Sequence, residues 1–327
     1  MGANPVPGQI TAANPKDILT GTGILIFFGA ATLYFPVFGF IFFLLMPLPV
    51  AFYRVKFGRS PSGTMTVAAL VVIWLIGRAT AMDLWLMLCM TGLGFALGEA
   101  LERDLSIEET IAYPCAAVLA AAAAALVVAG GISDTGPLEL ISGYVEKNIE
   151  MTAAAYEETG VQDKRIQMLI DSPERIHYVL MRIMPALAVS GLLFSAWVNM
   201  LMARIVLPAL NAGRTGFSRL NRWKAPDNLV WAAIGCALLV MAAKHPVSFI
   251  GINGLIILMM IYLFQGLAVV SFYFETRRVP MFLRIIIYSL LVIQQIFALV
   301  VAGLGFFDTW ADFRRLGAEG GGNGEAS

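Results

Sequence analysis

The sequence has 327 residues, of which 59% are hydrophobic and 13% charged, with a formal net charge of +0. Soluble domains are close to half apolar and a quarter charged, so this composition excludes an ordinary soluble fold. A mean hydropathy of +0.78 indicates a protein that lies in a lipid bilayer. The balanced charge, with no run of Lys or Arg, excludes a nucleic-acid partner.

The first seventeen residues form a stretch of polar character with three prolines, and residues 1–17 are predicted to be a disordered lead. Apolar segments then follow to residue 306, and about 20 residues are needed for one span. They predict an all-α polytopic transmembrane bundle of about nine membrane helices, five within 18–131 and four within 178–306. The nine segments are 18–35, 37–53, 64–79, 82–100, 111–131, 178–206, 228–243, 248–273 and 281–306. The segments 64–79 and 228–243 are short, and whether they span fully stays open.

Two local patterns constrain how these segments are arranged. The prolines of "MPLP" at 46–49 free backbone groups that neighbouring helices must satisfy inside a membrane. Basic residues are concentrated in the loops 54–63, 204–227 and 275–284, which predicts a cytoplasmic N-terminus. Arg314 and Arg315 then fall on the opposite face, so the side of the C-terminus stays open.

The region 132–177 is the only sizeable polar stretch between the two predicted bundles. Apolar residues recur there at helical spacing with glutamates between them, which predicts an extramembrane subdomain of amphipathic helices. Ser172-Pro173 is typical of a helix start. Ser106 and Glu109 fit a capping box at the start of segment 111–131.

Catalytic signatures are absent from the sequence. It contains no phosphate-binding loop, no dinucleotide-binding glycine motif, no HExxH and no GxSxG, so no enzyme and no cofactor are predicted. The three cysteines lie in or beside apolar segments and read as small buried hydrophobes. With only two histidines, no metal site is predicted.

Polar side chains within the apolar segments are the candidate ligand-binding residues, because such groups face a bundle interior or a cavity. The alternative is that they hydrogen-bond neighbouring helices. If a ligand binds to these residues, Arg182 or Asp308 would lie near the entrance of its site. The candidates are Asn199, Asn253, Gln265, Gln294 and Gln295.

The closing stretch "GLGFFDTWADFRRL" at 303–316 combines aromatic residues with charges. Its Trp and Phe residues are typical of a membrane-interface belt, so 307–327 is predicted to be an interfacial motif followed by a disordered tail. Arg315 lies three residues after Asp312, a spacing that predicts an ion pair between them on a helix. Asp308 has no cation in the preceding turn, and we expect a structural ion pair with an arginine of another helix, such as Arg182.

Four stretches resemble the YybS-like family of bacterial multi-pass membrane proteins of unknown function. They are "PVFGFIFFLLMPLPVAFYRVKFG", "MPALAVSGLLFSAWVNMLMARIVLP", "FQGLAVVSFYF" and the closing stretch. The resemblance implies a bacterial inner-membrane protein. It also implies a remote likeness to the substrate-binding components of energy-coupling-factor transporters, whose small residues on the first helix dock an energising subunit.

Two functions are compatible with these patterns. The first is a non-enzymatic, small-molecule-binding or transport component whose partners are the lipid bilayer and an energising transporter subunit. The second is a membrane scaffold or assembly protein that docks other membrane proteins through region 132–177 or the acidic loop 99–113. A transporter predicts a polar cavity among the later helices, whereas a scaffold predicts that their polar residues are satisfied by neighbouring helices.

Overall fold

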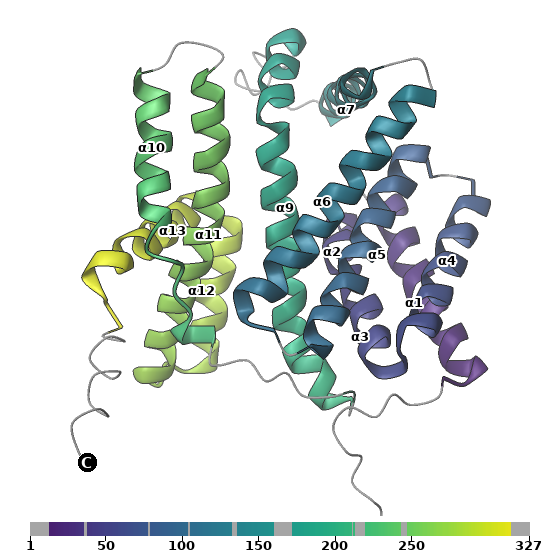
Figure 1. The fold of residues 1–327 in the computed structure, drawn as a ribbon, viewed down its shortest axis with the longest axis horizontal. Coiled ribbons are helices and arrows are strands. Elements are labelled where there is room, and N and C mark those ends of the chain that lie inside the picture. The colour runs from purple at the N-terminus through teal and green to yellow at the C-terminus, as the bar shows by residue number, and fades with distance from the viewer. Residues whose placement is uncertain are drawn as a thin grey trace, which may run out of the picture. The chain divides into compact units, whose positions relative to one another are not determined.

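The structure is a computed structural model, and every regular element in its described residues is helical (Figure 1). It describes residues 13–35, 38–77, 79–103, 105–132, 136–159, 172–210, 212, 220–242 and 247–314. The helices are α1 (Pro15–Tyr34), α2 (Gly39–Leu45), α3 (Pro47–Phe57), α4 (Arg59–Leu75), α5 (Ala81–Glu102), α6 (Ile107–Ile132), α7 (Pro137–Thr159), α9 (Pro173–Ala209), η1 (Leu220–Arg222), α10 (Leu229–Ala242), α11 (Val247–Thr276), α12 (Met281–Ile293) and α13 (Gln295–Ala311).

The helices form two compact units. Unit 1 contains α1–α7 and both ends of α9, while unit 2 contains Arg182–Ser190 of α9 together with η1 and α10–α13. The sequence predicted that the second bundle begins at residue 178, but the structure groups the later half of α9 with unit 1. The reason is local: polar side chains of that half bond the backbone of α2.

The described residues do not confirm nine membrane helices. Six are long and apolar enough to cross a bilayer: α1, α2 and α3 taken together, α5, α6, α9 and α11. The segment 281–306 is broken into α12 and α13, which are bent by 104° and would make a seventh span if they cross as one. At 17 and 14 residues, α4 and α10 are shorter than the about 20 residues that one span needs.

Several helices begin at capping boxes, in which two residues at the helix start each accept, with the side chain, a hydrogen bond from the other's backbone N–H. Ser106 and Glu109 make the predicted pair at α6, with both bonds at 3.2 Å. Asn14 and Asp17 make one at α1, so the helix starts at Pro15 and the disordered lead predicted to residue 17 is too long.

Region 132–177 contains α7, whose Val145 is buried while Glu146 and Glu150 are exposed. Ser142 Oγ lies 2.9 Å from His177 Nε2, which ties α7 to the first turns of α9. The second short helix predicted after Gly160 lies outside the described residues. The described part of this region is therefore an amphipathic helix that belongs to unit 1.

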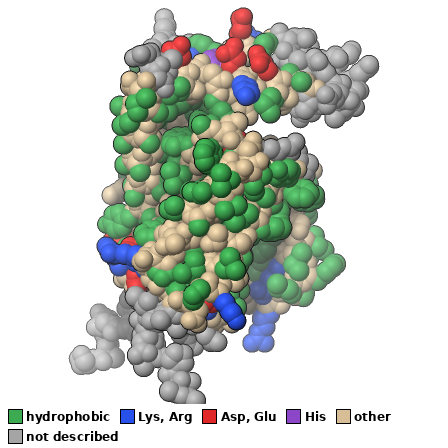
Figure 2. Space-filling view, turned by 90° about the vertical axis from the view of Figure 1, so that its right-hand side faces the viewer, with side chains coloured by type: hydrophobic (Ala, Val, Ile, Leu, Met, Phe, Trp, Pro, Cys, Tyr) green, Lys and Arg blue, Asp and Glu red, His purple; other side chains and the backbone are tan. Residues whose placement is uncertain are grey.

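Many apolar side chains remain exposed on the surface of the helices. On the face that Figure 2 shows, they cover the middle, and charged side chains gather toward the upper and lower ends. Trp74 and Leu75 of α4, for example, are exposed. Large apolar surfaces of this kind are stable when lipid covers them.

Candidate functional site

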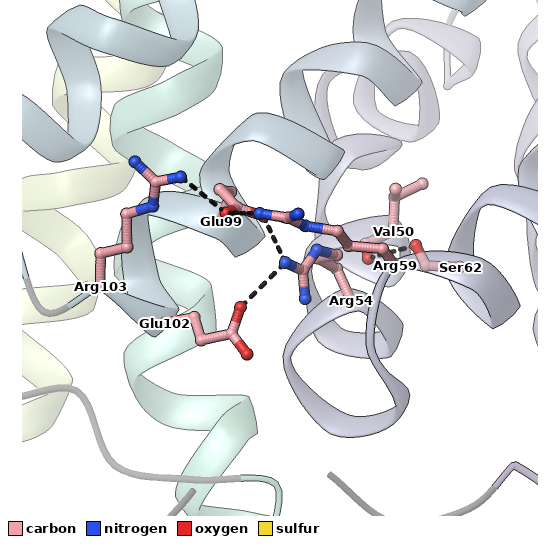
Figure 3. A network of polar contacts seen from close by, with 7 residues as sticks. All are labelled: Val50, Arg54, Arg59, Ser62, Glu99, Glu102 and Arg103. Atoms are coloured by element: carbon pink, nitrogen blue, oxygen red, sulfur yellow. Dashed lines mark hydrogen bonds and ion pairs between the residues drawn. The ribbon is translucent and has the colours of Figure 1, made fainter.

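A cluster of charged side chains in unit 1 lies where α3, α4 and α5 meet. We call it the Glu99 cluster, and it consists of Arg54, Arg59, Glu99, Glu102 and Arg103 (Figure 3). A single residue separates α3 from α4: Gly58, with φ +88 and ψ −172, a conformation that is essentially restricted to glycine. This sharp turn brings Arg54 and Arg59 to the same end of α5.

Glu99 is the centre of the cluster. Its carboxylate accepts hydrogen bonds from Arg54, Arg59 and Arg103, and the Arg103 bond is 3.0 Å long. Arg54 also pairs with Glu102 at 2.9 Å. The Arg54 side chain is only 2% exposed, and its Nε has no hydrogen-bond partner among the described residues. The cluster therefore holds three guanidinium groups against two carboxylates, an excess of one positive charge.

Close helix packing buries Arg54. A methyl group on Gly98 would overlap the Arg54 side chain, and one on Gly94 would overlap the backbone of Pro47. The four-residue spacing of these glycines is the signal for tight helix packing. The basic composition of 54–63 predicted an aqueous loop there, but α3 continues to Phe57. Sequence reasoning therefore missed that Arg54 is buried and paired.

A second feature of unit 1 is the break between α2 and α3. Met46 keeps helical backbone at φ −56 and ψ −33, but the hydrogen bonding of the helix is interrupted there because Pro47 and Pro49 carry no N–H. The carbonyl of Leu44 accepts a 3.2 Å bond from Ser195 Oγ and a 2.7 Å bond from Asn199 Nδ2. Neighbouring side chains on α9 thus satisfy a carbonyl beside the break.

Asn199 is only partly satisfied by these contacts. It is 1% exposed, and its Nδ2 also donates to the carbonyl of Ser195 at 2.7 Å. Its Oδ1 has no hydrogen-bond partner among the described residues. A buried acceptor left in this state is rare, because it has lost its bonds to water without replacing them.

Asn253 of α11 bonds the backbone of α9, within unit 2. Its Nδ2 donates to the carbonyl of Arg182 at 2.8 Å, and its Oδ1 accepts from the N–H of Ala186 at 3.0 Å. These two backbone groups would bond each other in an unbroken helix, but Pro185 lies between them. The Asn253 amide therefore bonds the two backbone groups of α9 between which Pro185 lies.

Gln265 belongs to a buried network in unit 2, which we call the Asp308 network: Gln265, Asp308 and Arg314. Gln265 Nε2 donates to Asp308 Oδ2 at 3.1 Å, and Arg314 Nη2 pairs with the same oxygen at 2.7 Å. The side chains of Asp308 and Arg314 are 1% and 0% exposed. The cation for Asp308 thus comes from six residues further along the chain.

The backbone around α13 explains how Arg314 reaches Asp308. Asp312 takes a left-handed conformation at φ +39 and ends the helix, and the N–H of Phe313 donates to Asp308 Oδ1 at 3.1 Å. Arg314 Nη1 also donates to the carbonyl of Trp223 at 2.8 Å. The expected partner Arg182 instead lies over the Phe249 ring, 5.4 Å from its centroid.

The pairing of Asp308 with Arg182 is therefore wrong, and Arg314 replaces it because the chain folds back after α13. Arg315 lies outside the described residues, so its pairing with Asp312 stays a prediction. Trp310 is exposed, in keeping with an interface anchor, while Asp308 on the same helix is buried.

The four candidate ligand-binding residues of unit 2 do not form one site. Gln294 lies in extended backbone at the break between α12 and α13, and both Gln294 and Gln295 are exposed. Asn253 and Gln265 are twelve residues apart on α11, which is about 18 Å along a helix. Of all five candidates, Asn199 alone is assigned to unit 1.

Comparison with known families identifies what kind of protein carries these features. The model of a family described as "Predicted membrane protein (DUF2232)" matches residues 23–309. The chain belongs to this family. Comparisons with curated proteins and with solved structures gave no match. As a member of this family with six candidate spans among its described residues, the chain is a membrane protein.

Proposed function

We propose that this member of the family is a non-enzymatic, small-molecule-binding component of a membrane transport system, with its site at the α2–α3 break. The observation that carries the proposal is the buried Oδ1 of Asn199, which has no partner among the described residues. The resemblance to substrate-binding components of energy-coupling-factor transporters supports it, and the proposal includes a location in a bacterial inner membrane.

Prolines inside a membrane helix interrupt its backbone hydrogen bonding, and transporters place binding sites where such interruptions leave polar groups away from lipid. The Asn199 Oδ1 provides such a group inside a candidate span, next to the Leu44 carbonyl that Ser195 and Asn199 already bond. An unpaired buried acceptor is unfavourable by about 1–3 kcal/mol, so a donor is required. The ligand class is therefore a small molecule with an N–H or O–H group.

Native mass spectrometry of gently purified protein tests this assignment. We expect a bound small molecule on the native chain and its loss from Asn199→Ala, while Gln295→Ala, a change at an exposed side chain, retains it. Thermal unfolding of each variant in detergent monitors folding. Retention of the same ligand by folded Asn199→Ala would place the site elsewhere.

The scaffold hypothesis has its own supporting observation. Asn253 and Gln265 are engaged by neighbouring helices and backbone, which is what a scaffold predicts for its polar residues. The exposed face of α7, with Glu146 and Glu150, would then dock a partner protein. Two results would favour this function. The purified chain would carry no small molecule. A partner protein cross-linked to the native chain would be lost in Glu146→Lys/Glu150→Lys but retained in the control Glu174→Lys.

A further inference from the structure

We infer that the Glu99 cluster, together with the N-terminus of α4, binds the phosphate of an anionic lipid headgroup. The first observation is charge. Three arginines face two glutamates, and the two outer arginines remain accessible: Arg59 and Arg103 are 66% and 63% exposed. Each contacts Glu99 on one side, which leaves N–H donors of its guanidinium for an outside acceptor.

The second observation is the uncapped start of α4. Its N-cap is Gly58, which has no side chain, and its first turn holds no acidic residue. The first N–H groups of a helix have no acceptor within that helix, and the helix dipole makes this end positive. Arg59 is the first residue of α4, so the uncapped end lies at the cluster. Phosphate groups are favoured ligands at such ends.

The third observation is Arg54, the buried base of the cluster. Its Nη2 bonds Glu99 and Glu102, so its guanidinium faces the cluster (Figure 3). The Nε of the same guanidinium is a donor without a partner among the described residues, although the side chain is 2% exposed. The Nε itself is inaccessible, so Arg54 contributes positive charge beneath Arg59 and Arg103, whose exposed guanidinium groups would meet a phosphate.

The position of the cluster favours a lipid over a soluble phosphate. Arg54 lies in the last turn of α3 and Glu99 in the last turn of α5, where two candidate spans end. Side chains at the ends of spans lie at the level of the headgroups. A basic residue near an anionic membrane surface contributes about 1 kcal/mol of attraction, which corresponds to about a fivefold change in affinity.

The test uses the full chain in nanodiscs of phosphatidylcholine with increasing phosphatidylglycerol, with retained lipid counted by native mass spectrometry. We expect a preference for phosphatidylglycerol that Arg59→Gln/Arg103→Gln weakens by about 25-fold, since two basic residues are lost. The control Arg277→Gln/Arg278→Gln removes the same charge from the α11–α12 turn and should change binding less than twofold.

A second variant keeps the inference testable if that pair does not fold. Ser60→Glu adds a carboxylate to the exposed first turn of α4. Acidic residues are compatible with helix formation at this position. The added negative charge should abolish the preference for phosphatidylglycerol. Equal retention of both lipids by the native chain, or an unchanged preference in the folded variants, would overturn the inference. Saturable binding of inorganic phosphate in phosphatidylcholine discs, lost in the same variants, would assign the site to a soluble anion instead.

Discussion

Asp308 is a charged side chain in the interior of unit 2. It is buried, and its carboxylate is bonded by Arg314, Gln265 and the backbone of Phe313. Removing one member of a buried ion pair leaves the other charge without compensation, at a typical loss of about 3–5 kcal/mol. We therefore expect Asp308→Asn to destabilise the chain by about this amount in equilibrium unfolding in detergent.

The matching control is the exposed pair of Lys224 and Asp227, whose Oδ1 lies 2.9 Å from Nζ. Solvent screens such pairs, so Asp227→Asn should change the free energy of unfolding by less than about 1 kcal/mol. The double variant Asp308→Asn/Arg314→Gln removes both charges and should recover part of the lost stability. Equal stability of Asp308→Asn and the native chain would contradict the role of the pair.

At the scale of elements, α9 depends on α11 at the position of Pro185. Asn253→Ala would leave the Arg182 carbonyl and the Ala186 N–H without the amide that bonds them, which should lose about 1–3 kcal/mol. With Pro185→Ala in the same chain, these two backbone groups can bond each other. We expect Asn253→Ala to be less harmful in that background, and a double-mutant cycle of unfolding free energies measures the difference.

Two glycines set the distance between α11 and α13. A methyl group on Gly266 would overlap the carbonyl of Val301, and one on Gly305 would overlap the carbonyl of Tyr262. Gly305→Ala should therefore separate the helices and destabilise unit 2 by about 1–3 kcal/mol.

Gly303 provides the control for this prediction, because it lies on the same helix and has nothing within 4 Å of an added methyl group. Gly303→Ala should be neutral or stabilising by up to about 1 kcal/mol, since alanine favours helix. Thermal unfolding of both variants gives the comparison, and equal effects would mean that close approach does not determine the packing.

At the scale of the whole molecule, the membrane topology depends on α4. Arg59 at its start contacts Glu99, whereas α5 begins 18 residues before Glu99, about 27 Å away along the helix. The chain must cover this distance between Arg59 and Ala81, so we expect α4 to cross wherever α5 crosses. Its 17 residues extend about 25 Å, slightly less than the hydrocarbon thickness.

Cysteine labelling checks this topology. In a chain whose native cysteines are replaced by alanine, we expect Ser60→Cys and Ala81→Cys to react with a membrane-impermeant maleimide from opposite faces of sealed vesicles. Both positions are exposed in the structure. Labelling of both from one face would show that α4 does not cross.

The sequence by itself determined the features that depend on local chemistry. Composition identified an all-helical membrane protein, and the Ser106–Glu109 box marked the start of α6 because a capping box needs only four consecutive residues. The prolines at 47 and 49 indicated freed backbone groups that another helix must satisfy. Periodicity likewise revealed the amphipathic α7, because burial on one face leaves a regular pattern.

Only the tertiary structure decided which polar groups meet. A buried charge in an apolar helix must have a partner, but its sequence does not say which one. Arg54 finds Glu99 across 45 residues because glycines let α3 and α5 approach closely. Asp308 finds Arg314 because the chain reverses at Asp312. These pairings depend on helix packing and on one backbone conformation, which neither hydropathy nor spacing encodes.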